Sequence, residues 1–189
     1  MPLHEVSFAA PLTAAQKAEL AKAMTDIHAG AFQTPRWFVN VVFTDASQHT
    51  WFVGGRPCMP PRILTTDVVL KRLSNRITAF VRNGAHRTRE AWEQLCQDIN
   101  SAWRQIVHRS YNVNGLPPNE LELAAIFIMG ELLAGLKVGL PVPKAGEEQL
   151  WAQQHFEVFK QRATLGDEVF VDVLGEMEGS PWLKNSPQS

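Results

Sequence analysis

A proline stands at position 2, directly before residues 3–8, whose composition predicts a β-strand. A small second residue normally lets the initiator methionine be removed, which exposes a secondary amine with an ordinary pKa of roughly 8. Neighbouring guanidinium groups and partial burial both lower that pKa and make the amine a general base near neutral pH, whereas a neighbouring carboxylate keeps it protonated as an acid. Proteins without such chemistry also start with Met-Pro, so Pro2 becomes a candidate only together with suitable partners.

A histidine and three arginines are the candidate partners. His28 lies at the end of the first predicted helix, where the helix C-terminus favours an imidazolium that can contact an anionic substrate. Stabilisation of the helix end alone is the simpler interpretation. Arg82, Arg87 and Arg89 surround the Asn83-Gly84 turn. Arginines at such a junction can bind a carboxylate through two parallel hydrogen bonds, although a solvated basic turn has the same composition.

Two similar units of the sequence must position these residues. Each unit has a strand, an amphipathic helix and a second strand, and Thr13 and Thr88 are the predicted helix caps, with Gln16 completing a capping box. The predicted elements are strands 3–8 and 37–43 around helix 13–31, a hairpin arm at 50–53 that pairs beside strand 37–43, and strands 77–81 and 121–128 around helix 88–107. The predicted fold class is therefore α/β (α+β), with two fused β-α-β units in one sheet and both helices on one face.

The segments outside the two units complete the predicted organisation. We expect a double β-α-β domain over 1–143 and, over 144–189, a helical extension with a frayed tail, containing helices at 147–162 and 167–174. Residues 54–75 hold three prolines and a short helix over 67–73, and form either a lid or a surface excursion. The sheet face without helices needs a cover, and a further copy of the chain is the simplest one.

Composition excludes several classes of function. The 18 Lys and Arg against 19 Asp and Glu leave a net charge of −1, which argues against nucleic acid as a partner. Six scattered histidines and two cysteines predict neither a metal site nor a disulfide framework. Cys96 lies on an apolar helix stripe and Cys58 between prolines, so neither is a good nucleophile. Without a signal peptide or an apolar run long enough to span a bilayer, we expect a cytoplasmic protein that does not bind membranes.

Several of these segments, taken in order, resemble the tautomerase superfamily, and within it the cis-3-chloroacrylic acid dehalogenase-like group of the oxalocrotonate tautomerase type. The resemblance spans roughly residues 2 to 175. It rests on Pro2, the Leu12-Thr13 helix entry, AKAMTDIH ending at His28, strand 38–43, the Phe52-Val53-Gly54-Gly55 turn, the junction 80–88 and, weakly, Trp151 and Gly166-Asp167-Glu168.

This resemblance implies a fold, an assembly and a chemistry. Its members fuse two β-α-β units, form homotrimers, need no cofactor or metal, and use the amino-terminal proline as base or acid on a small carboxylic acid. Carried over residue by residue, Pro2 matches the catalytic amine, His28 the histidine of the first helix, and Arg87 one of two catalytic arginines. Arg89 is the candidate for the second, substrate-binding arginine.

The same comparison indicates where this chain departs from the group. The arginine junction is about two residues shorter. The tyrosine and glutamate that activate water in the dehalogenase align with Ile128 and Lys137, neither of which is the needed residue, and Glu131 is a candidate substitute. We therefore expect an isomerase, a cofactor-independent tautomerase of small enol, keto or unsaturated carboxylic acids. A related hydratase, dehalogenase or decarboxylase, and a catalytically inactive binding or scaffold protein of the same fold, are the alternatives.

Overall fold

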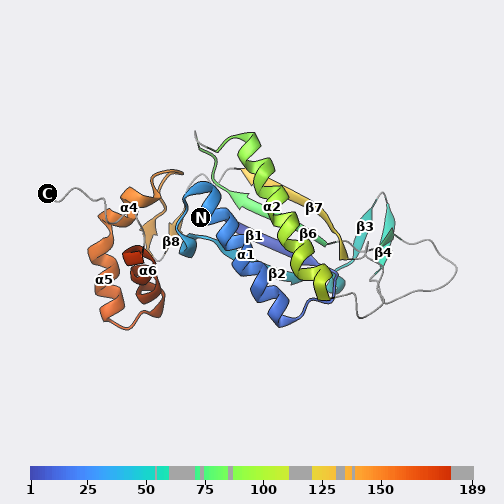
Figure 1. The fold of residues 1–189 in the computed structure, drawn as a ribbon, viewed down its shortest axis with the longest axis horizontal. Coiled ribbons are helices and arrows are strands. Elements are labelled where there is room, and N and C mark those ends of the chain that lie inside the picture. The colour runs from blue at the N-terminus through green and yellow to red at the C-terminus, as the bar shows by residue number, and fades with distance from the viewer. Residues whose placement is uncertain are drawn as a thin grey trace.

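The computed structural model of the chain describes residues 1–53, 55–59, 71–72, 75–84, 87–110, 121–130, 135–137 and 139–179. Most of the predicted lid, including residues 67–70 and 73 of the predicted helix over 67–73, and the tail after 179 lie outside these ranges. Residues 71–72 of that predicted helix are described and form a short strand, so the helix is wrong there. Within them, a mixed α/β layer is followed by a helical extension (Figure 1).

The central sheet contains four strands in the order β2-β1-β6-β7. β1 (Leu3–Phe8) and β2 (Asn40–Asp45) run parallel, as do β6 (Asn75–Val81) and β7 (Leu123–Gly130), while the central pair β1 and β6 is antiparallel. Helices α1 (Ala14–Phe32) and α2 (Arg89–Val107) cover the same face of this sheet (Figure 1). The predicted pair of fused β-α-β units is therefore confirmed.

Both helices begin where the sequence predicts. The Thr13 side chain accepts a hydrogen bond from the backbone N–H of Gln16, and the Gln16 side chain accepts one from the backbone of Thr13, which completes the capping box. Thr88 accepts a hydrogen bond from the Ala91 N–H at the start of α2. α1 ends at Gln33, which adopts a left-handed conformation with φ 50°.

Two predicted strand positions are wrong. Residues Arg36–Phe38 form a 3-10 turn, so the second strand begins at Asn40 instead of 37. The segment around 50–53 forms β3 (Trp51–Val53), which pairs with β4 (Arg56–Met59) in a separate sheet with β5 (Lys71–Arg72), not with β2. Gly55, with φ +73°, allows the tight reversal from β3 into β4.

The extension contains three helices. The helix predicted over 147–162 is split at His155 into α4 (Glu148–Gln154) and α5 (Phe156–Thr164), and α6 (Glu168–Gly179) follows. Two short strands precede them, β8 (Leu136–Lys137) and β9 (Leu140–Pro141). The extension lies next to the edge of the main layer where the chain begins (Figure 1).

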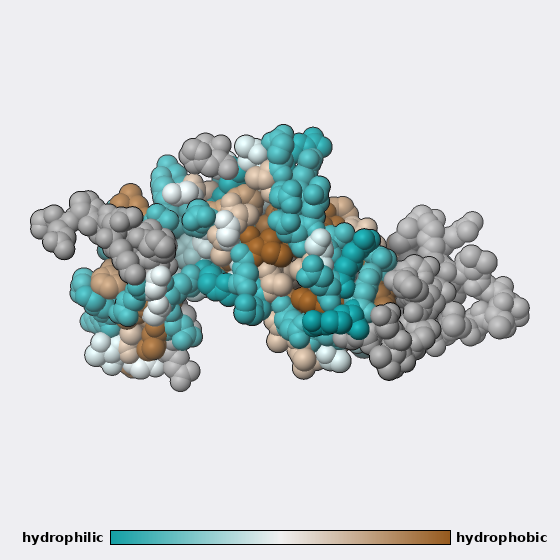
Figure 2. Space-filling model, viewed as in Figure 1, coloured by the Kyte–Doolittle hydropathy of each residue, from teal (hydrophilic) through white to brown (hydrophobic). Residues whose placement is uncertain are grey.

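Two apolar clusters hold these layers together. The larger one fills the space between the sheet and the two helices, and Figure 2 shows apolar side chains between the mainly hydrophilic outer surfaces of α1 and α2. The second joins Phe38, at the entry to β2, to the buried residues of the extension: Trp151, Ala152, Phe159, Phe170, Val173 and Met177. Met1 packs against this second cluster. Among the described residues, no helix is both long and apolar enough to cross a membrane.

A buried asparagine connects three parts of the main layer. The Asn75 Oδ1 accepts hydrogen bonds from the backbone N–H groups of Ala9 (2.8 Å) and Ala10 (2.9 Å), and its Nδ2 donates to the Glu122 carbonyl at 3.1 Å. Its side chain thus ties the end of β1 to the starts of β6 and β7.

We predict that Asn75→Ala lowers the free energy of unfolding by about 2–3 kcal/mol, because it leaves buried backbone groups without partners. Urea unfolding measures this change. Asn100→Ala, in the interior of α2, is the matched control and should shift stability by less than about 0.5 kcal/mol. Equal effects of the two substitutions would contradict the assigned role of Asn75.

Candidate active site

The antiparallel pairing of β1 with β6 brings the chain start to the arginine junction. Leu3 pairs with Phe80, so the register, continued by one and two residues, places Pro2 beside Val81 and Met1 beside Arg82. Pro2 is buried, and its carbonyl accepts a hydrogen bond from the Asn40 N–H at 3.0 Å. Pro2 therefore lies between the two strands that flank β1.

Two buried arginines meet a single carboxylate beside this point. Arg82 and Arg87 are only 6% and 8% exposed, and each places Nη2 near Oε1 of Glu148, at 2.8 and 2.9 Å. Arg87 also donates to the Arg82 carbonyl (3.1 Å) and to the Thr34 hydroxyl (3.4 Å). Burial lowers the pKa of Arg82, and the Glu148 carboxylate opposes that shift. The three side chains form a buried group with a net charge of +1.

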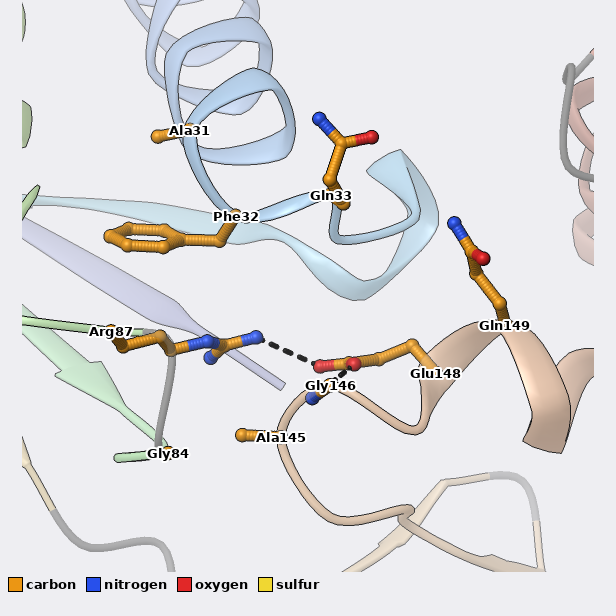
Figure 3. Close-up of a pocket in the computed structure, with 9 residues that line it drawn as sticks. All are labelled: Ala31, Phe32, Gln33, Gly84, Arg87, Ala145, Gly146, Glu148 and Gln149. Carbon is orange, nitrogen blue, oxygen red and sulfur yellow. Dashed lines mark hydrogen bonds and ion pairs between the residues drawn. The ribbon is translucent and has the colours of Figure 1, made fainter.

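Glu148 comes from the extension, at the first residue of α4. It is 2% exposed, and its second oxygen, Oε2, accepts a hydrogen bond from the Gly146 N–H at 2.6 Å. Figure 3 shows the Glu148 and Arg87 side chains pointing toward one another. The sequence analysis missed Glu148 because an acidic residue in the first turn of a surface helix is ordinary.

The arginine that joins Arg87 is Arg82, not Arg89. The Arg89 side chain is 85% exposed and forms an ion pair with Glu93 one helical turn later. Because Thr88 caps α2, Arg89 is already the first helical residue, while Arg82 directly follows the end of β6. Arg89 does line a second cavity, of about 400 Å³, together with Arg87, Trp92 and Cys96.

His28 lies inside the layer between sheet and helices, not at an exposed helix end. It is fully buried, with ring contacts to Phe32 and Trp92, and its Nδ1 is 3.2 Å from Nε2 of His4. Burial lowers the pKa of His28 to about 2, and the neighbouring positive charges act in the same direction. The predicted imidazolium is therefore wrong, because His28 follows Leu20 and Met24 at helical spacing on the face of α1 that is buried in the core.

His4 is a buried partner that the sequence analysis overlooked. Burial lowers its pKa to about 4, so both imidazoles are neutral at physiological pH. The signal was available: His4, Val6 and Phe8 alternate along β1 and point to the same buried face. Within the described part of the chain, Nε2 of His28 and Nδ1 of His4 have no hydrogen-bond partner.

A cavity of about 380 Å³ adjoins the buried ion group. It is lined by Arg87, Glu148 and the residues drawn with them in Figure 3: Ala31, Phe32, Gln33, Gly84, Ala145, Gly146 and Gln149. It combines an apolar wall, amide side chains and the Arg87–Glu148 ion pair, so a small polar molecule in it would contact a guanidinium group whose charge is already compensated by a carboxylate.

Two of the other candidate groups, Ile128 and Cys96, line the second cavity together with Arg87. Ile128 is half-buried on β7 and Lys137 belongs to β8, whereas Glu131 lies outside the described residues. Burial raises the pKa of the Cys96 thiol, with Glu93 adding to the shift, so this thiol stays protonated. Among the described residues, no group of three or more His, Cys, Asp or Glu side chains is arranged to hold a metal ion.

Sequence comparison assigns the chain to a family. Residues 1–126 match the family described as "Putative oxalocrotonate tautomerase enzyme", and the chain belongs to this family of the tautomerase superfamily, as its sequence motifs predict. A search of curated proteins finds no significant match.

Solved structures share the fold. The structure of N1, a member of the cis-3-chloroacrylic acid dehalogenase family, has a TM-score of 0.51 and 24% identity, over 80% of this chain and 90% of that one. Native RhCC from Rhodococcus jostii RHA1 has a TM-score of 0.50 and 20% identity, over 80% of this chain and 95% of that one. At these identities the likeness shows the fold alone.

The buried imidazoles predict how stability depends on pH. Both folded-state pKa values lie below the ordinary 6.5, so the unfolded chain binds more protons than the folded chain once the pH falls below about 6.5. Stability is thus greatest above pH 6.5 and falls by roughly 1 kcal/mol per pH unit for each imidazole as the pH drops toward 4.

Urea unfolding at pH 7.5, 6.5, 5.5 and 4.5 measures this dependence. His28→Gln should reduce the slope by about half, because one of the two depressed imidazoles is removed. His49→Gln, at an exposed position, is the control and should leave the slope unchanged. An unchanged slope in His28→Gln would show that this imidazole is not held neutral.

Proposed function

We propose that this protein is a cofactor-independent tautomerase that acts on a small enol, keto or unsaturated carboxylic acid with Pro2 as general base and acid. The observation that carries the proposal is the placement of Pro2 at the start of β1, buried and next to the junction that holds Arg82 and Arg87. Membership of the tautomerase family supports the same reaction class.

The chemistry requires removal of Met1, which places the free amine on Pro2. Two nearby guanidinium groups and a buried site both disfavour the ammonium form, so the amine can accept a proton at neutral pH. In ketonisation, Pro2 takes the proton of the enol hydroxyl, the enol C=C electrons capture a proton on carbon, and the ammonium of Pro2 supplies that proton. Proton and charge balance without a cofactor.

Arg87 lines the cavity, whereas His28 is fully buried in ring contact with Phe32 and Trp92, so the two have different roles in this proposal. Arg87, assisted by Arg82, binds the carboxylate and stabilises the negative charge of the enolate. His28 contributes a neutral donor and no charge, because it is held as an imidazole. Since its Nδ1 pairs with His4, a proton on Nε2 of His28 requires His4 to donate through its own Nε2.

The outer sheet face supports a homotrimer. Phe80, Phe127 and Met129 are 42–52% exposed on the face opposite the helices, where they form an apolar surface on β6 and β7, while Val42 on β2 is separated from them by the exposed Glu5 of β1. The resemblance to the tautomerase superfamily suggests that three copies of the chain pack together through such faces.

A binding or scaffold protein without catalysis is the second candidate. Met1 packs against the cluster of Phe38 and the extension. While Met1 stays in place, the nitrogen of Pro2 is an amide and cannot accept a proton. A hydratase or dehalogenase is less well supported, because Ile128 and Lys137 stand where the dehalogenase has its water-activating pair.

We predict that Pro2→Ala lowers the rate of phenylenolpyruvate ketonisation at least about a hundredfold, because the secondary amine is the proton carrier. Intact mass measured on the same samples reports whether Met1 is absent. Pro11→Ala, at an exposed position, is the control and should retain full activity. Undiminished turnover by Pro2→Ala would end the proline mechanism, and a chain that retains Met1 and is inert would favour the scaffold.

We also predict that Phe127→Lys converts the trimer to smaller species, because it places a charge in the apolar contact. Size-exclusion chromatography with light scattering gives the mass. Leu165→Lys, 80% exposed on the extension, is the control and should remain trimeric. A wild-type chain that is monomeric at micromolar concentration would rule out the trimer.

A further inference from the structure

The Glu148 carboxylate occupies the arginine pair as an external carboxylate would. The side chain of glutamate beyond its Cα is chemically a propionate, and its Oε1 lies within 3 Å of a guanidinium nitrogen of both Arg82 and Arg87. The arginine pair is thus already occupied by a group from the same chain, and Figure 3 shows its contact with Arg87.

The buried pair requires an anion at all times. Two guanidinium groups removed from water and close together are strongly unfavourable unless a carboxylate compensates them. A substrate carboxylate and the Glu148 carboxylate carry the same charge, so exchanging one for the other conserves the charge of the site.

Glu148 leaves part of the donor capacity of the pair unused. Only Oε1 serves both arginines, while Oε2 is turned to the Gly146 N–H. Among the described residues, no acceptor contacts Nε and Nη1 of the buried Arg82. A carboxylate that offers both oxygens to the arginines can therefore form charge-assisted hydrogen bonds that Glu148 does not.

The segment that carries Glu148 is a short connection between the arginine junction and α4. Gly146 has φ +91°, a conformation that glycine adopts without strain, and it directly precedes the start of α4. The segment rests against Gly84, where an added Cβ would lie 3.0 Å from Cβ of Ala145. Trp151 and Phe159 pack in the apolar cluster of the extension, whereas the Glu148 carboxylate is held by polar partners, so its contacts differ in kind from those that hold the helices together.

We propose that Glu148 is a resident carboxylate ligand of Arg82 and Arg87 that the substrate's carboxylate displaces, so that residues 144–148 act as a latch over the site; this rests on the proposed function. The latch lowers the apparent affinity for every carboxylate by the fraction of time that it is closed. The latch also favours ligands that form better hydrogen bonds with Arg82 and Arg87 than Glu148 does.

Binding of sodium propionate, measured by calorimetry, tests the exchange. Glu148→Ala removes a propionate-sized group, so we expect it to bind propionate at least about tenfold more tightly than the wild type and to gain thermal stability with propionate. Propionamide should have neither effect. Glu178→Ala, exposed on α6 of the same extension and outside the latch, is the matched control and should behave as the wild type.

A second variant covers the case in which Glu148→Ala does not fold. Gly84→Ala leaves every charge in place but pushes on Ala145, so it should open the latch and strengthen propionate binding. Gly30→Ala, where an added Cβ meets nothing within 4 Å, is its control. Affinities that equal the wild-type value in whichever of Glu148→Ala and Gly84→Ala fold would overturn the proposal.

Trypsin reports the movement in the wild-type chain. Lys144 is exposed at the start of the latch, and saturating propionate should increase cleavage after it, detected by mass spectrometry, at least about threefold over propionamide. Bound propionate without faster cleavage would show that Glu148 stays in place.

These binding readouts do not use Pro2, so exchange in a protein that lacks turnover would refute the tautomerase proposal and leave the latch standing.

Discussion

The compensation of two buried guanidinium groups by one carboxylate is the constraint on which the site depends. Arg82 and Arg87 follow β6 closely and are withdrawn from water, and isolated cations there would be strongly destabilising. The compensating Glu148 comes from α4, beyond the residues that match the family. The helical extension therefore supplies the carboxylate that neutralises part of the site's charge, and it also supplies most residues of the second apolar cluster.

The sheet topology determines which part of the chain lies beside this ion group. An antiparallel pair at the centre of the sheet brings the start of β1 to the end of β6, so the first residues of the chain lie at the arginine junction. Parallel pairing on either side follows from the two crossover helices, which both pack on one face. The opposite face keeps an apolar surface that a further copy of the chain can cover.

Burial disfavours the protonated form of the titratable nitrogens near this junction. It lowers the pKa values of His4 and His28 and keeps both imidazoles neutral, with the positive charges of Arg82 and Arg87 reinforcing the effect at His28. An amine at Pro2 would experience the same desolvation and the same positive charges. A cationic and poorly hydrated centre thus favours both a neutral base and an anionic ligand.

The local features of this protein are determined by the sequence alone. Thr13, Gln16 and Thr88 cap their helices through contacts within three residues, and periodicity identifies both β-α-β units, because these interactions are short-range. Tertiary structure decided the remainder. The charge of His28 depends on its burial between α1 and the sheet. The pairing of β3 with β4 depends on the turn at Gly55. Arg82 joins Arg87 in place of Arg89 because the Glu148 carboxylate, 66 residues away from Arg82 in the sequence, pairs with it. A contact at that separation leaves no periodic trace in either segment, so only the folded chain reveals it.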